Sequence, residues 1–361
     1  MSNRTAVEAL GLAVRAGVPV LLWGAPGSGK SSAVRGLADA LGWPCETVIA
    51  SIREPSDFAG LPVIVDDAVR FAPPSWATSL SDAGRGLLFL DELSTAPPAV
   101  QAALLRVVLE RTVGDLELPD DVVIVAAANP PELSADGWDL SAPLANRFCH
   151  LDWPVDPAAV ATGLAAGFAP PPVPRLPDRW DEAERRARAD VAAFLLLRPT
   201  LTSAPPVDRS GAGRAWPSPR SWEMATRLLA AARSVEIGGD VVAALITGTV
   251  GDGAGLEFLG WLADLDLPDP EALLADPDGF ELPERGDRVY AVLTSVAAAV
   301  AARPTPERWS AAWTVLGAAA DTVPDVAALA ARILVAARPA DAPTPPEAAR
   351  FLGLLRDAGL V

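Results

Sequence analysis

Eight consecutive residues near the N-terminus have the types and spacing of a phosphate-binding loop. The segment is Gly24-Ala25-Pro26-Gly27-Ser28-Gly29-Lys30-Ser31, which fits the pattern GxxxxGK[ST]. Its glycines let the backbone turn tightly so that N–H groups point at phosphate oxygens, and the helix expected after it adds the positive end of its dipole. We expect Lys30 to reach the terminal phosphates and the Ser31 hydroxyl to bind Mg²⁺, with Ser32 beside them.

Lys30 is the only lysine in the chain, which otherwise uses arginine for its basic side chains. Arginine carries a wide planar fork, whereas a lysine ammonium is a compact point charge that suits a phosphate pocket. A lysine at this one position, in a chain that otherwise uses arginine, favours a phosphate site over a chance glycine-rich turn.

Two adjacent carboxylates follow an apolar segment further along the chain. Residues 87–90 are all apolar and predict a buried strand that ends at Asp91 and Glu92. Asp91 would hold Mg²⁺, mostly through water, and Glu92 would polarise the attacking water of a hydrolysis reaction. The alternative is an acidic cap after a strand, which the phosphate loop at Lys30 makes the weaker interpretation.

Three further polar residues stand where they could assist this chemistry. Asn129 follows the apolar run 122–128 and could orient water or contact the γ-phosphate, although a turn before Pro130 is the alternative role. Arg147 begins the last predicted strand and could reach a neighbouring subunit's nucleotide, or form only a surface salt bridge. Arg220 opens a later helix and could contact phosphate, or be only a helix-start arginine.

The elements that must bring these residues together alternate between strand and helix. The predicted strands are 18–23, 47–50, 86–90, 122–128 and 148–153. Helices are predicted at 5–16, 30–41, 97–110 and 141–146, with Thr95 as the N-cap of the third. Nearly all-apolar strands alternating with helices indicate an α/β fold with a parallel five-stranded sheet covered on both faces, whose reactive groups gather at the carboxyl ends of its strands.

Two segments interrupt this pattern, and the sequence beyond it is helical. Residues 53–74 predict a short helix followed by an inserted hairpin, and residues 112–118 a second hairpin. Further helices are predicted at 156–168, 181–197, 221–235 and 240–250, with a helical region over 256–360. Trp76 and Trp138 are expected in loops, where they could contact a partner. We therefore expect three domains: a nucleotide-binding core (1–154), an all-α lid (155–238) and a helical C-terminal extension (239–361).

Composition excludes several classes of function. The net charge is −17 and the basic residues are not clustered, which argues against nucleic acid as the main partner. Two cysteines and one histidine make a disulfide framework or a zinc site improbable. Met1 to Gly17 lacks the pattern of a signal peptide, and the apolar stretch 290–302 is too short to span a bilayer. A cytoplasmic protein without membrane contact is expected.

With these residues in place, the sequence resembles the AAA+ ATPases, and within them the MoxR-like group (AAA_5-type, helix-2-insert clade). The resemblance spans about residues 18–233 and is strongest from 23 to 153. The segment 24–31 matches the Walker A loop and 87–92 matches Walker B. Asn129 matches sensor 1, Arg147 the arginine finger and Arg220 sensor 2, which could act on its own subunit's nucleotide or on a neighbour's.

The resemblance implies a P-loop NTPase that uses ATP and Mg²⁺, assembled as a homo-oligomeric ring, often a hexamer, with ATP between subunits. It also implies ATP-driven remodelling of a protein client or adaptor, commonly one with a von Willebrand factor A domain. The segments 53–74 and 112–118 would face a central pore or the substrate. Relatives include chelatase motors, Rubisco activators and gas-vesicle ATPases, so the client stays open. An ATP-dependent switch or scaffold with little hydrolysis is the alternative, and a DNA translocase is less favoured because the chain is acidic.

Overall fold

The computed structural model describes residues 1–133, 138–207, 211, 213–264 and 267–351. The described chain divides into two compact units. The first contains residues 1–177 and 201–256, and the second contains 178–200 and the described residues from 257 onward. This division follows contacts within the chain and does not test the domain boundaries expected at 154/155 and 238/239, which stay a prediction.

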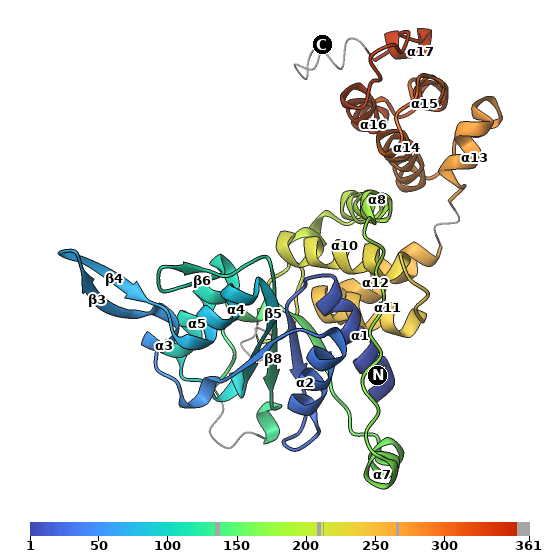
Figure 1. The fold of residues 1–361 in the computed structure, drawn as a ribbon. Coiled ribbons are helices and arrows are strands. Elements are labelled where there is room, and N and C mark those ends of the chain that lie inside the picture. The colour runs from blue at the N-terminus through green and yellow to red at the C-terminus, as the bar shows by residue number, and fades with distance from the viewer. Residues whose placement is uncertain (134–137, 208–210, 212, 265–266, 352–361) are drawn as a thin grey trace. The chain divides into compact units, whose positions relative to one another are not determined.

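Five parallel strands form the central sheet of the first unit, in the order β2-β5-β8-β1-β9. Figure 1 labels two neighbouring strands of this sheet, β5 and β8. The strands are β1 (Val20–Trp23), β2 (Cys45–Ile49), β5 (Arg85–Asp91), β8 (Asp121–Ala128) and β9 (Cys149–Asp152). Strands β1, β5 and β8 are apolar and buried along almost their whole length, as expected of parallel strands covered on both faces. The predicted α/β fold with a five-stranded parallel sheet is confirmed.

Helices lie on both sides of this sheet (Figure 1). The helices of the first unit are α1 (Asn3–Arg15), α2 (Lys30–Leu41), α3 (Ser56–Ala59), α4 (Ser75–Ala83), α5 (Pro98–Glu110), α6 (Ala142–Ala145), α7 (Pro157–Ala166), α10 (Pro219–Arg233), α11 (Gly239–Val250) and the start of α12 (Asp252–Ala263). Helices α4 and α5 bury Leu80 and Leu104 in the same core cluster as Leu88 of β5. This packing fixes β5, and with it the acidic end of that strand.

Two details of this unit differ from the sequence prediction. Trp76 lies on α4 and is buried in the core against Phe58, so its expected place in a loop, where it could contact a partner, was wrong. Thr95 does not cap α5, because it lies in a 3₁₀ turn (Leu93–Thr95) and its hydroxyl donates to the carbonyl oxygen of Glu92. Trp138 is exposed and outside helices and strands, as expected.

Both predicted hairpins are present, and the turn of the second contacts β4 near the base of the first. The first pairs β3 (Leu61–Val65) with β4 (Ala68–Ala72), and the second pairs β6 (Thr112–Val113) with β7 (Leu116–Glu117). The Asp115 N–H donates to Phe71 O at 2.9 Å, and the Phe71 N–H donates to the Asp115 carboxylate at 3.0 Å. Gly114 permits this approach, since a Cβ there would lie 2.4 Å from Phe71 O. The two hairpins therefore form one joined structure.

The second unit is helical in its described part, as predicted. Its helices are α8 (Asp181–Leu197), the remainder of α12, α13 (Pro270–Ala275), α14 (Gly286–Ala302), α15 (Pro306–Ala319), α16 (Pro324–Ala336) and α17 (Pro346–Ala349). Trp309, Trp313 and Leu316 of α15 form the centre of its core. No helix in either unit, within the described residues, is both long and apolar enough to cross a bilayer.

Candidate active site

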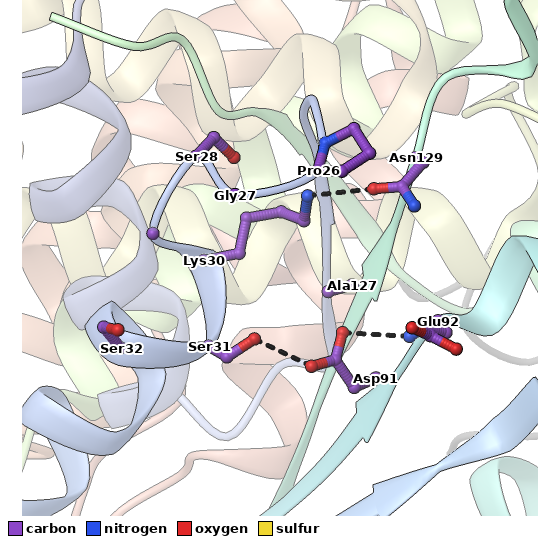
Figure 2. Close-up of a pocket in the computed structure, with 11 residues that line it drawn as sticks. Pro26, Gly27, Ser28, Lys30, Ser31, Ser32, Asp91, Glu92, Ala127 and Asn129 are labelled. Carbon is purple, nitrogen blue, oxygen red and sulfur yellow. Dashed lines mark hydrogen bonds between the residues drawn. The ribbon is translucent and has the colours of Figure 1, made fainter. Parts of the chain in front are cut away.

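A cavity of about 330 Å³ opens at the carboxyl ends of β1, β5 and β8 (Figure 2). Its walls come from residues 26–32, from Asp91 at the end of β5 and Glu92 after it, and from Ala127 of β8 and Asn129 after that strand. The three strands are neighbours in the sheet, so their ends meet at one edge although they are far apart in sequence. The cavity therefore brings together the residues at 30, 31, 91, 92 and 129 that the motifs singled out.

The glycines of the loop are needed for its path. Gly27 and Gly29 have φ values of +74° and +87°, a region that glycine enters without steric cost. Gly24 packs so closely that a Cβ there would lie 2.7 Å from the carbonyl oxygen of Trp153. The Trp153 indole N–H also donates to Ser28 O at 3.2 Å, which fixes the loop against the strand end after β9.

The side chain of Lys30 lies inside the loop, and the residue is 7% exposed. It donates to Gly24 O at 2.6 Å, to Ala25 O at 3.0 Å and to Asn129 Oδ1 at 3.2 Å. Burial lowers the pKa of Lys30, an effect that the nearby Asp91 carboxylate opposes. An anion entering the cavity would gain a poorly solvated positive charge whose present partners are neutral oxygens.

Ser31 and Asp91 supply the oxygen atoms for a divalent cation. The Ser31 hydroxyl donates to Asp91 Oδ2 at 2.7 Å, and the other carboxylate oxygen accepts from the Glu92 N–H at 2.9 Å (Figure 2). Among the described residues no group of three or more His, Cys, Asp or Glu side chains could hold a metal alone. One hydroxyl and one carboxylate fit Mg²⁺, which characteristically takes few protein ligands and completes its shell with phosphate oxygens and water.

Glu92 is held beside the cavity by a residue that the sequence analysis missed. Its backbone lies in the left-handed region at φ +57°, unusual for a non-glycine residue. Its carboxylate accepts a hydrogen bond from the Ser51 hydroxyl, in the 3₁₀ turn (Ala50–Ile52) after β2. Because β2 is the neighbour of β5, Ser51 reaches Glu92 although 41 residues separate them.

Asn129 faces Lys30 from the end of β8 and is also supported by a residue that we did not predict. Its side-chain oxygen accepts from the Lys30 ammonium, and its backbone N–H donates to Ser94 Oγ at 3.1 Å. Ser94 is buried in the turn that follows Glu92. The turn after β5 and the end of β8 are thus hydrogen-bonded to each other, which fixes the spacing between Glu92 and Asn129.

Comparison with known proteins agrees with this geometry. Residues 19–148 match the profile of the AAA domain family, dynein-related subfamily. Residues 19–148 form an AAA+ domain. The match begins at the residue before β1 and ends at the residue before β9, so it contains the whole cavity lining.

Similar solved structures share less with the chain. A suspected ATPase from Cytophaga hutchinsonii is 16% identical over 66% of this chain and 73% of its own length, with a TM-score of 0.38. NtrX from Brucella abortus is 18% identical over 45% of this chain and 41% of its own length, with a TM-score of 0.28. No curated protein matches the chain.

The two predicted arginines lie outside the lining of the AAA+ domain's cavity. Arg147 follows α6 and is buried, and one of its Nη atoms donates to the carbonyl oxygen of Pro143. Arg220 is exposed in the first turn of α10. Burial lowers the pKa of Arg147, and the positive charge of Arg220 lowers it further. Neither side chain lines the phosphate cavity of its own chain.

A second cavity, of about 540 Å³, adjoins the first and was not predicted. Its mainly apolar walls come from α1, α2, Trp153, α7 and the segment 168–172, and it shares Ser28, Gly29 and Ser32 with the phosphate cavity. Pro171 packs on Gly36 of α2, where a Cβ would lie 3.3 Å from the proline ring. Ser28 Oγ is buried and has no hydrogen-bond partner in the described chain. A flat apolar group could occupy this space next to the phosphate loop.

Proposed function

We propose that the chain is a Mg²⁺-dependent ATPase of the MoxR-like group, which hydrolyses ATP between the subunits of a ring to remodel or activate a protein partner. The observation that carries this proposal is the single cavity shared by Lys30, Ser31, Asp91, Glu92 and Asn129. A cradle of glycines with one buried ammonium suits a triphosphate, and two carboxylates at a strand end suit hydrolysis.

In this proposal each residue of the cavity has one task. Lys30 exchanges its bonds to Gly24 O, Ala25 O and Asn129 for phosphate oxygens. Ser31 and Asp91 hold Mg²⁺, which when bound neutralises charge on the phosphates. Glu92 accepts a proton from the attacking water, and one of its two carboxylate oxygens is held by the Ser51 hydroxyl in this structure. The amide of Asn129, freed from Lys30, orients that water.

The second cavity is the proposed site of the nucleobase. It touches the phosphate cavity at Ser28, Gly29 and Ser32, so one nucleotide could occupy both. Its lining is mainly apolar, which suits the faces of a purine ring. We therefore place the base between α1, α2 and α7, with Phe168 and Pro171 among the groups that exclude water from it.

Arg147 and Arg220 are proposed to act on the nucleotide of a neighbouring subunit. Both lie outside the cavity of their own chain, while Arg147 is close enough to Arg220 for their charges to interact. Guanidinium groups brought to that nucleotide would stabilise the charge that develops on a transferred phosphoryl group. The geometry of one chain supports action in trans, although Arg220 could still reach its own nucleotide after a movement of α10.

The joined hairpins are the proposed contact with the client. Ile64 (80% exposed) and Val69 (61% exposed) are paired on one face of the β3–β4 hairpin, and Leu61 (61% exposed) lies on the other face, so the hairpin presents apolar side chains to solvent on both faces. Contiguous exposed apolar surface marks an interaction site in soluble proteins. By the resemblance to the MoxR-like group, we propose a client or adaptor that contains a von Willebrand factor A domain.

The decisive experiment is Glu92→Gln, with Glu110→Gln as its control. Glu92→Gln removes the base but keeps the shape of the side chain, so we expect ATP binding to persist while turnover falls by a factor on the order of 10²–10⁴. Glu110 is an exposed residue of α5 outside the cavity, and its variant should behave as the wild type. Wild-type turnover in Glu92→Gln would show that the base is assigned to the wrong residue.

Action in trans is tested by mixing two inactive variants. Arg147→Ala protomers keep an intact cavity, and Lys30→Ala protomers keep an intact Arg147. A ring that contains both has some interfaces with every required group, so turnover should partly recover. If rings assemble but no mixing ratio restores turnover, Arg147 does not act on its neighbour.

A switch or scaffold with little hydrolysis is the second candidate. The hydrogen bond from Ser51 to Glu92 favours it, since it ties the carboxylate that would act as base to the turn after β2. Turnover measured with and without the client separates the two. If the chain hydrolyses ATP to remodel its client, affinity isolation with Glu92→Gln and ATP should trap the client. If the chain is a switch, the wild type and Glu92→Gln should release the client equally.

A further inference from the structure

We propose that His150 is a positioning residue, which connects the strand that leads into the phosphate loop with the turn that carries Arg147. The proposal rests on the proposed function, in which Arg147 completes a neighbouring site. His150 itself lines neither the phosphate cavity nor the adjoining apolar one.

The imidazole of His150 makes one hydrogen bond from each of its nitrogens. On one side, the indole N–H of Trp23 donates to Nδ1 at 2.9 Å. On the other, Nε2 lies 2.8 Å from the carbonyl oxygen of Ala145, so Nε2 must carry the proton and donate. Trp23 is the residue directly before Gly24, and Ala145 is two residues before Arg147. The His150 ring therefore connects the start of the phosphate loop with the turn that carries Arg147.

Both bonds require a neutral imidazole with a single tautomer. A proton on Nδ1 would face the Trp23 N–H and break that contact. Burial lowers the pKa of His150 to about 4, an effect to which the charge of Arg214 adds and which Asp152 and the Ala145 carbonyl oppose. The Trp23 ring is stacked with the imidazole, and the two ring centroids are 6.1 Å apart. The Arg214 guanidinium lies over the Trp23 ring, with its Cζ 4.2 Å from the ring centroid. The bridge is thus held in one protonation state at neutral pH.

The placement of Arg147 depends on backbone geometry more than on a charged partner. In the described residues no carboxylate pairs with Arg147, and its Nε is buried without a hydrogen bond. Its guanidinium is held by Pro143 O, and its N–H donates to Leu144 O at 3.1 Å, so both contacts belong to the α6 turn itself. A side chain fixed in this way moves when its turn moves. His150 holds that turn through Ala145.

The same turn also contacts the start of α10. Asn146 donates to Trp216 O at 2.8 Å and accepts from the Ser218 hydroxyl at 2.5 Å, next to the helix that carries Arg220. A displacement of the turn would therefore disturb both arginines. The hydrogen bond from His150 to Ala145 therefore helps to position both Arg147 and Arg220.

A buried histidine could instead be only a well-satisfied core residue. In that case its replacement would lower stability without any specific effect on the neighbouring subunit's site. A positioning role predicts a different pattern, in which the variant protomer binds nucleotide normally and fails only as a donor of Arg147. Mixed rings can distinguish these two cases.

The test compares His150→Phe with His150→Gln and with Leu151→Val. Phenylalanine keeps a ring but removes both hydrogen bonds, while glutamine can still donate to Ala145 O. Leu151→Val trims a buried neighbour on the same strand and touches neither bond. Each variant is assayed as an assembled ring for ATP-analogue affinity, for turnover, and for recovery of turnover on mixing with Lys30→Ala protomers.

We expect His150→Phe to keep nucleotide affinity and to lose turnover by about 100-fold, since misplacing a catalytic group by an ångström costs about that much. Mixing with Lys30→Ala protomers should restore part of the activity, and Arg147→Ala should add no further loss. His150→Gln should regain most of the turnover, and Leu151→Val should match the wild type. If His150→Phe fails to assemble, His150→Gln carries the test, because an assembled glutamine variant that loses turnover by about 100-fold would overturn the proposal.

Other outcomes would also overturn it. Full turnover in His150→Phe, or a loss that adds to that of Arg147→Ala, would show that the bridge does not act through Arg147. A fall in nucleotide affinity that matches the fall in turnover would indicate a structural role only. A different result would contradict the proposed function itself. Wild-type turnover in Arg147→Ala would show that this arginine has no role in hydrolysis, independently of the results for the His150 variants.

Discussion

The protonation of His150 can be measured directly, because it is the only histidine in the chain. In a protein without a histidine tag, a single imidazole signal in a ¹H–¹³C NMR spectrum reports this residue. Burial and the nearby Arg214 place its pKa at about 4, against an ordinary value of 6.5. At pH 5.5 an ordinary imidazole would be about 90% protonated, and His150 about 3% protonated. We therefore expect its chemical shifts to stay constant from pH 8 to pH 5.5.

The same shift in pKa has a consequence for stability with a definite sign. Between pH 6.5 and pH 4 the unfolded chain binds a proton at residue 150 and the folded chain does not, so stability falls as pH falls. At pH 5.5 this lost stabilisation is about 1 kcal/mol relative to pH 8. His150→Phe should lack this contribution, so the difference in unfolding free energy between the variant and the wild type should change with pH in this window.

A clear titration midpoint near 6.5 would refute this reasoning. It would mean that the imidazole is solvated, or that its bonds to Trp23 and Ala145 do not form in solution. Denaturant unfolding of both proteins at pH 8 and pH 5.5, followed by far-UV circular dichroism, gives the second measurement. An identical pH dependence of stability in the wild type and His150→Phe would contradict the assigned protonation state.

The remaining predictions concern the cavities and the hairpin. Lys30→Arg should lose ATP binding by at least about 10-fold despite keeping the charge, because the guanidinium is too wide for the space between Gly24 O and Ala25 O; calorimetry of nucleotide binding measures this. Ser51→Ala should raise basal turnover several-fold by freeing Glu92, and an unchanged or lower rate in a steady-state phosphate assay would argue against the holding role of that hydroxyl. Gly36→Leu should displace Pro171 and weaken ATP more than inorganic triphosphate, and equal weakening of both ligands would place the base elsewhere. Ile64→Ser should keep basal turnover and abolish stimulation by the client; retained stimulation would exclude the hairpin tip as the contact.

The sequence predicted those features that depend on local pattern and chain order. Strand β8 was predictable because residues 122–128 are uninterruptedly apolar, and α2 because it follows the glycines that end the loop. Glu92 and Asn129 were predictable because each directly follows such a strand. Their meeting in one cavity then followed from the parallel sheet.

The missed features depend on contacts between distant segments or on competing local bonds. Ser51 reaches Glu92 only because β2 and β5 are neighbours, and no local pattern marks it. Trp76 lies in a helix that starts directly after two prolines, and prolines are typical of loops. Its burial depends on packing against Phe58, which is distant in sequence. Thr95 bonds back to Glu92 O rather than capping α5. The apolar cavity is assembled from α1, α2 and residues 153–172, so it has no linear signature.

The chain passes between its two compact units three times, at residues 177/178, 200/201 and 256/257. Helix α8 comes from the middle of the sequence, yet Phe194 on it packs on Phe258 and Trp261, whose ring centroids lie 5.2 and 5.5 Å away. A protein shortened at residue 256 would keep α8 but lose these partners, and would expose aromatic surface that promotes aggregation. Dissection of this protein therefore requires removing residues 178–200 together with the C-terminal segment, and bridging the gap that remains.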